Sequence, residues 1–219
     1  MHSNPRGFQA GCQIWWGAAS GAARAQRHLL SDAEQARATT LRQAADQDRF
    51  VAGRALLRSA AAEVLGTTAS QVAVGSSCPD RSRPHGKPTL PGTGWEASIS
   101  HSGHLVAVAL SSAGPVGIDV ERVDETLPLD DLEMLSPAEH KGIAHWSALS
   151  LFRTWTRKEA VLKATGDGLR VPMPSLSLTS PDMPPAVTSF TYHPDLVDRI
   201  SMTHHVECVA ILEPVNKGA

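Results

Sequence analysis

The strongest constraint on the fold of this chain is a short apolar run that carries two carboxylates, Val116-Gly117-Ile118-Asp119-Val120-Glu121. A turn pair, Gly114-Pro115, precedes it, and β-branched residues alternate along it, so we predict a β-strand. Side chains two residues apart on a strand project from the same face, which places Asp119 beside Glu121. Neighbouring carboxylates suit magnesium, which prefers oxygen ligands. A half-buried strand with a polar outer face would have the same spacing.

A second charged pair lies on a predicted helix from Leu149 to Thr165, which Gly166 ends. Large apolar side chains recur along one stripe of this helix with the 3.6-residue period. Glu159 and Lys163 lie at the edge of that stripe, where a carboxylate and an ammonium group need partners. A metal ion with a phosphate group would supply them. A surface Glu–Lys pair one turn apart is the simpler alternative.

The other patterns predict an α+β protein with two halves, residues 1–112 and 113–219. In the first half we expect helices at Ser31–Ala45 and Asp48–Leu65, and strands at Gln13–Gly17, Val72–Val74, Ala97–Ser100 and Leu105–Ser111. In the second half we expect a capping box at Ser136–Glu139, and strands at Leu176–Leu178, Ser189–His193 and Glu207–Leu212.

The composition is typical of a soluble intracellular enzyme. The 219 residues include 20 basic and 22 acidic side chains, which indicates no general affinity for nucleic acid. No apolar stretch has the length of a membrane span, and the N-terminus lacks the pattern of a signal peptide. Three distant cysteines, Cys12, Cys78 and Cys208, form no disulfide framework. We therefore expect a cytoplasmic protein.

Five short segments together resemble the 4′-phosphopantetheinyl transferases, specifically the Sfp-type branch. They are Arg49–Arg54, Gly86–Pro88, Ser98–Ser102, Gly117–Glu121 and Trp155–Leu169, in the order of that family. The resemblance runs from about Leu30 to the end of the chain. It implies two similar α+β halves related by a pseudo-twofold axis, each a small antiparallel sheet packed with helices. It also implies a monomer with the active site at the interface of the halves.

The activity that this resemblance implies is transfer of 4′-phosphopantetheine from coenzyme A to a serine of an apo acyl or peptidyl carrier protein. The carrier would belong to a polyketide, nonribosomal peptide or fatty-acid synthase, and 3′,5′-ADP would be released. Coenzyme A would be the co-substrate and Mg²⁺ the cofactor, with Mn²⁺ as a substitute. No nucleic acid or membrane partner is implied. A non-catalytic coenzyme A-binding regulatory module and a magnesium-dependent pyrophosphate hydrolase are the alternatives.

The resemblance also implies a role for each matching residue. The catalytic residues would be Glu159, Lys163 and Asp119, with Glu159 the best candidate for the base. The magnesium ligands would be Asp119, Glu121 and Glu159. The residues that bind coenzyme A would be Arg54, Lys87, Pro88, Ser100, His101, Asp119, Glu159 and Lys163. Among these, Arg54 would bind the 3′-phosphate, on the side of the first half that also receives the adenine.

Two other patterns could indicate different chemistry. Ser100-His101 is not expected to be a nucleophile–base pair, because neighbours on a strand face opposite ways. The segment His204-His205-x-x-Cys208 lacks the usual spacing of zinc ligands.

For the docking of an acidic carrier helix, a basic or apolar patch is expected. The candidates are Arg157, Lys158, Arg170, Leu127 and Leu129.

Overall fold

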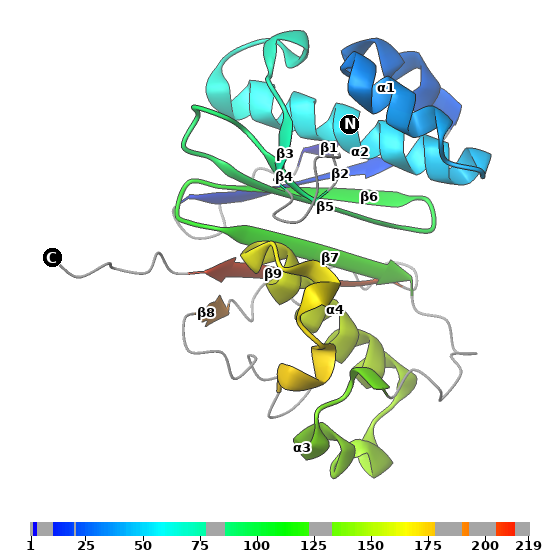
Figure 1. Cartoon of the computed structure of the whole chain (residues 1–219), viewed down its shortest axis with the longest axis vertical. Helices are drawn as coiled ribbons and strands as arrows, with labels where there is room; N and C mark the ends of the chain where they lie inside the picture. The colour runs from blue at the N-terminus through cyan, green and yellow to red at the C-terminus, as the bar shows by residue number, and fades with distance from the viewer. Residues whose placement is uncertain are drawn as a thin grey trace, which may run out of the picture. The chain divides into compact units, whose positions relative to one another are not determined.

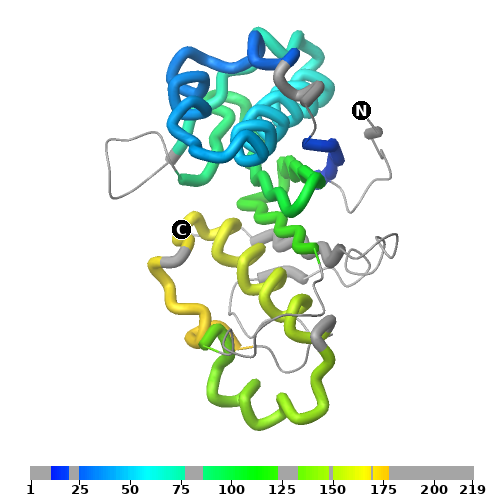
Figure 2. Tube along the Cα trace, turned by 90° about the vertical axis from the view of Figure 1, so that its right-hand side faces the viewer, coloured from blue at the N-terminus to red at the C-terminus, as the bar shows by residue number. Residues whose placement is uncertain are grey.

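The computed structural model of the chain describes residues 2–3, 11–19, 21–77, 86–122, 133–177, 190–192 and 205–212. The predicted α+β class is confirmed (Figure 1). The chain divides into two compact units, Met1–Ser112 and Ala113–Ala219, which are described separately below (Figure 2). Within the described residues, no helix has the length and apolar character needed to cross a membrane.

The first unit contains one antiparallel sheet of six strands in the order β1-β2-β6-β5-β4-β3. Its strands are β1 (His2–Ser3), β2 (Cys12–Ala18), β3 (Gly75–Ser77), β4 (Lys87–Thr89), β5 (Glu96–Ser102) and β6 (Leu105–Ser111). The strands predicted at Ala97–Ser100 and Leu105–Ser111 are confirmed as β5 and β6, which pair with each other. The strand predicted at Val72–Val74 is wrong, because Val72 is buried in the core from a loop and β3 begins only at Gly75.

Helix α2 (Ala44–Leu65) packs on β2, β5 and β6 and supplies most of the helical part of the core. Its glycine, Gly53, allows a close approach to the sheet, since a Cβ atom built there would lie 3.1 Å from Cγ2 of Ile99. The helix ends at Gly66, whose φ of 64° is a left-handed conformation that glycine adopts without strain.

Helix α1 (Asp32–Thr39) begins at the predicted capping box of Ser31 and Glu34. It ends at Thr39, six residues before the predicted end at Ala45. The hydroxyl groups of Thr39 and Thr40 donate hydrogen bonds to backbone carbonyls of the last turn, and such local bonds compete with helix continuation. The following residues then lead directly into α2.

Cys12 is a buried free thiol on β2, with an exposed fraction of 1%. Burial raises the pKa of this thiol to about 12. Because the thiolate is the reactive form, we predict that Cys12 resists iodoacetamide in the folded protein and reacts after unfolding in guanidinium. Peptide mapping by mass spectrometry measures both states, and rapid labelling of Cys12 in the folded protein would contradict the prediction.

The second unit contains a three-stranded antiparallel sheet in the order β7-β9-β8, with helix α4 packed on it (Figure 1). Its elements are β7 (Val116–Arg122), α3 (Pro137–His140), α4 (Ala148–Thr165), β8 (Phe190–Tyr192) and β9 (His205–Leu212). These confirm the strands predicted at Val116–Glu121, Ser189–His193 and Glu207–Leu212, the capping box and the helix that Gly166 ends. Leu176, predicted in a strand, instead follows the 3-10 turn Met173–Ser175 and packs on an apolar cluster; Leu178 lies outside the described residues.

Candidate active site

The candidate site is built where α4 crosses β7 at very short range. Gly117 of β7 lies directly against the backbone of α4 at Ala160 and Ala164. A Cβ atom built on Gly117 would lie 2.5 Å from the backbone nitrogen of Ala164 and closer still to the carbonyl oxygen of Ala160. Small residues on both elements therefore permit a close contact that any side chain at position 117 would prevent. Because alternate strand residues share a face, Asp119 and Glu121 also lie on the face of β7 that carries Gly117.

This close packing brings Asp119 and Lys163 into contact. The ammonium group of Lys163 donates a hydrogen bond to Oδ1 of Asp119 over 2.5 Å. Asp119 is 2% exposed, while the side chain of Lys163 keeps an exposed fraction of 28%. A buried carboxylate requires a compensating positive charge, and the partly exposed Lys163 supplies it. Residues 44 positions apart in the sequence thus form one ion pair.

Glu159 lies one helical turn before Lys163, and its carboxyl is half-buried. Burial raises the pKa of this carboxyl above its ordinary value; the positive charge of Lys163 opposes the rise and the negative charge of Asp119 adds to it. Asp119, Glu159 and Lys163 therefore form one electrostatically coupled group. A carboxylate with a raised pKa is a better proton acceptor at neutral pH than an ordinary surface glutamate.

Magnesium binding at this group depends on how many carboxylates are gathered there. In the part of the chain that the structure describes, no three His, Cys, Asp or Glu side chains are grouped so as to hold a metal ion. The predicted set of three carboxylates, Asp119, Glu121 and Glu159, is therefore not assembled as such a cluster. Asp119 and Glu159 still offer two oxygen-bearing groups, which is the number that magnesium usually takes from protein. The donor set thus fits a magnesium ion that takes its other ligands from water and phosphate.

The raised pKa of Glu159 predicts a gain in stability when its charge is removed. A carboxyl group whose folded pKa exceeds the unfolded value stabilises the fold when protonated, and this contribution is lost as pH rises through the folded pKa. Glu159→Gln should therefore stabilise the protein at neutral pH by about 0.5–1 kcal/mol, a small gain because solvent screens a half-buried group. Thermal unfolding in a chelator at neutral and acidic pH measures it; a gain that persists below the ordinary carboxyl pKa would contradict the explanation.

Arg54, expected to hold the 3′-phosphate, lies on α2 in a cluster with two other charged groups. Its Nε atom is 3.6 Å from Oε1 of Glu34, and its guanidinium group lies 5.6 Å from the ring centroid of Phe50. Arg58, one turn further, pairs with Glu34 over 2.7 Å and is almost fully buried. Burial lowers the pKa of Arg54, while Glu34 raises it. One carboxylate thus faces two guanidinium groups, and the cluster keeps a net positive charge.

The remaining predicted coenzyme A contacts of the first unit lie on β4 and β5. Lys87 of β4 pairs with Glu96 of β5, with Nζ and Oε2 2.9 Å apart, and Pro88 follows it as a half-buried residue. Ser100 is 5% exposed and His101 is exposed. These two neighbours therefore face opposite sides of β5, as expected from strand geometry.

The predicted docking role of Arg157 and Lys158 is wrong, because both side chains are buried, with exposed fractions of 1% and 0%. Lys158 is enclosed by Met134, Glu139 and Met173 of the same unit. Arg170, in contrast, is exposed. Leu127 and Leu129, together with Cys78 and His204, lie outside the described residues.

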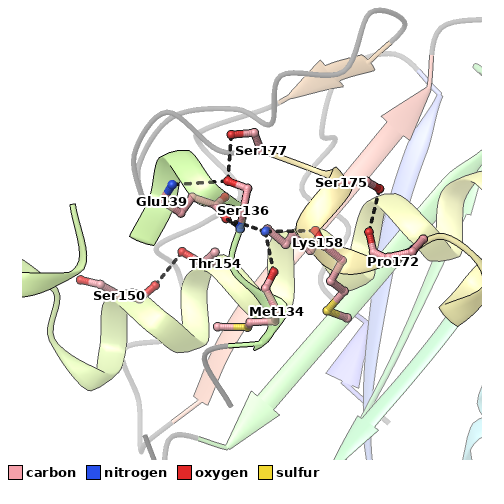
Figure 3. Close-up of polar contacts among 10 residues, drawn as sticks. Met134, Ser136, Glu139, Ser150, Thr154, Lys158, Pro172, Ser175 and Ser177 are labelled. Atoms are coloured by element: carbon pink, nitrogen blue, oxygen red, sulfur yellow. Dashed lines mark hydrogen bonds and ion pairs between the residues drawn. The ribbon is translucent and has the colours of Figure 1, made fainter. Parts of the chain in front are cut away.

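Sequence reasoning also missed the partner of Lys158, which is Glu139 (Figure 3). Glu139 is the third residue of the Ser136 capping box, a position that the sequence marks only for a local role. The second carboxyl contact of Glu139, to Lys158 19 residues later, could not be seen in that pattern.

The chain is similar to known proteins of one family. Residues 115–206, which include β7 and α4, match the family model of the 4'-phosphopantetheinyl transferase superfamily. The chain is 34% identical over 150 residues to 4'-phosphopantetheinyl transferase HetI of Nostoc sp., with 64% of this chain and 61% of that protein covered. It is 29% identical over 142 residues to a 4'-phosphopantetheinyl transferase of Bacillus subtilis, with coverages of 63% and 60%.

A third relative is 4'-phosphopantetheinyl transferase gsp of Aneurinibacillus migulanus, with 35% identity over 86 residues, 36% of this chain and 34% of that protein. The matched part thus spans about three fifths of the length of the first two relatives and one third of the third.

Proposed function

We propose, from the premise that the chain belongs to the 4′-phosphopantetheinyl transferase superfamily, that it transfers 4′-phosphopantetheine from coenzyme A to an apo carrier protein. The observation that carries this proposal is the coupled group of Asp119, Glu159 and Lys163. It places a proton acceptor, Glu159, near a cation whose side chain is partly exposed, Lys163. The chain would belong to the Sfp-type branch and act as a cytoplasmic monomer on acyl or peptidyl carrier proteins.

In the proposed reaction, the hydroxyl oxygen of a carrier serine attacks the β-phosphorus of coenzyme A. A new P–O bond forms to the serine, and the P–O bond to the adenosine-bearing phosphate breaks. The carboxylate of Glu159 accepts the hydroxyl proton, a task that its raised pKa favours. The leaving group departs as 3′,5′-ADP.

Lys163 would stabilise the negative charge that accumulates on the leaving phosphate, because it is a cation whose side chain is partly exposed. Asp119 would orient Lys163 through their 2.5 Å contact. Magnesium would be held by Asp119 and Glu159, the two carboxylates of the coupled group, and when bound it would neutralise phosphate charge.

Coenzyme A would be recognised in the first unit by the positively charged groups already described. The Arg54 cluster keeps a net positive charge, which suits the 3′-phosphate. Lys87, Pro88, Ser100 and His101 are the other proposed contacts of this unit.

Intact-mass spectrometry of an apo carrier protein tests the proposal. The carrier is incubated with this chain, coenzyme A and magnesium, with and without a chelator. A gain equal to one phosphopantetheine group, lost with the chelator, supports both the transfer and its metal dependence. Binding of coenzyme A without a mass gain on any of several carriers would overturn the transferase proposal in favour of a binding module.

A further inference from the structure

Lys158 is a fully buried ammonium group whose hydrogen-bonding capacity is filled. Its Nζ atom donates to Oε2 of Glu139 over 2.6 Å, to the carbonyl oxygen of Met134 over 2.8 Å and to that of Met173 over 3.2 Å. An ammonium group has three donors, and each finds an acceptor here (Figure 3). Both side chains of the ion pair have an exposed fraction of 0%.

The three acceptors come from two segments of the second unit, one before α4 in the sequence and one after it. Met134 precedes α3, Glu139 lies within α3, and Met173 begins the 3-10 turn that follows α4. Oε2 of Glu139 also accepts a hydrogen bond from the backbone nitrogen of Ser136 over 2.6 Å, so the capping box and the ion pair share one oxygen atom. Lys158 therefore joins α4 to the chain segments on both sides of it in the sequence.

Two contacts on different sides of α4 fix how the helix is rotated about its axis. At about 100° per residue, Lys158 and Ala160 point about 160° apart, and Glu159 lies between them. The backbone of α4 at Ala160 and Ala164 lies directly against Gly117 of β7. On the Lys158 side, Leu162 packs with Met134, Leu135 and Met173 in an apolar cluster. Glu159 thus lies on the side of α4 between the face that packs on the sheet and the face that packs on this cluster.

We propose that Lys158, together with Glu139, is a positioning residue that sets the rotation of α4 and thereby the direction of Glu159 toward Asp119 and Lys163. A rotation of the helix would pull Nζ of Lys158 away from its acceptors and leave a charge buried without them, which is strongly unfavourable. The apolar cluster alone has no such directional requirement. The catalytic consequence rests on the proposed transferase function.

A pair of variants separates positioning from simple stabilisation. Lys158→Met removes the cation that Glu139 contacts in this fully buried pair, so we expect a large drop in melting temperature. In the double variant Lys158→Met/Glu139→Gln, glutamine still caps Ser136 and methionine fills the space of the lysine stem. Replacement of both charges is usually close to neutral for stability, so the melting temperature should recover most of the loss.

The transfer rate at saturating coenzyme A and carrier is the second measurement. We expect the rate of the double variant to stay at least about 10-fold below that of wild type. Methionine cannot donate hydrogen bonds to the carbonyl groups of Met134 and Met173, so these contacts no longer fix the rotation of α4. Recovery of both melting temperature and rate would overturn the proposal, since Lys158 would then be only a structural residue.

Crystal structures of the wild type and the double variant provide a measurement that does not depend on transfer. We expect the 2.5 Å contact between Lys163 and Asp119 to be broken in the double variant. An unchanged contact would overturn the positioning role. If the wild-type chain transfers nothing to any carrier, the proposed function fails while this structural comparison still decides the role of Lys158.

Discussion

Glu159→Gln is expected to lower the rate of carrier modification by at least about 100-fold, the usual contribution of a positioned proton acceptor. Glutamine keeps the size of the side chain and can still accept a hydrogen bond, but it cannot take the serine proton. The same change is predicted to stabilise the fold slightly, because burial disfavours the charge of Glu159. A loss of rate in a protein that is at least as stable as wild type cannot be explained by unfolding.

The control is Glu133→Gln, which removes an exposed glutamate from the same unit. Rates are measured from the intact mass of the carrier at several times, with thermal unfolding recorded on the same preparations. We expect the control to match wild type in rate. If Glu159→Gln retains the wild-type rate, Glu159 is not the base and the proton must leave by another route.

Gly117→Ala is expected to have the largest effect on stability, a loss of at least about 3 kcal/mol in the second unit, at the upper end for overpacking. The new methyl group would lie 2.5 Å from the backbone nitrogen of Ala164 and closer still to the carbonyl of Ala160. These are backbone atoms, so no change of rotamer relieves the clash, and α4 must move away from β7. That movement would also separate Lys163 from Asp119, so transfer should fall together with stability.

Gly142→Ala is a suitable control for this substitution. Gly142 has an ordinary negative φ of -95°, and a Cβ atom there would meet its nearest neighbours at 3.6 and 3.7 Å, which is normal contact. Thermal unfolding of both variants measures the difference. A melting temperature for Gly117→Ala within error of the control would show that α4 and β7 are farther apart at Gly117 than these distances indicate.

The sequence was sufficient for the local geometry of the site. Alternation along Val116–Arg122 placed Asp119 and Glu121 on one face of a strand, and helical periodicity placed Glu159 beside Lys163. Each conclusion depends only on residues within one element. The helix boundaries set by Ser31, Ser136 and Gly166 were equally readable, because caps are made by neighbours in the chain.

Burial of individual charged residues was much harder to predict. Arg157 and Lys158 are adjacent basic residues in a charged stretch, which in isolation resembles a solvated face. Lys158 is buried because three carbonyl and carboxyl groups from distant segments converge on it, and the sequence gives no sign of that convergence. The wrong docking prediction for these residues has the same cause.

By itself, the sequence determined the longer helices and strands and which of their side chains share a face, since these follow from local spacing and capping. It also carried the family resemblance, through motifs that lie in order along the chain. Only the tertiary structure decided that Asp119 meets Lys163, that Gly117 is the point where α4 touches β7, and that Glu139 neutralises Lys158. These contacts join residues 19 to 47 positions apart. They depend on how two surfaces fit together, a property of packed side chains that no single segment encodes.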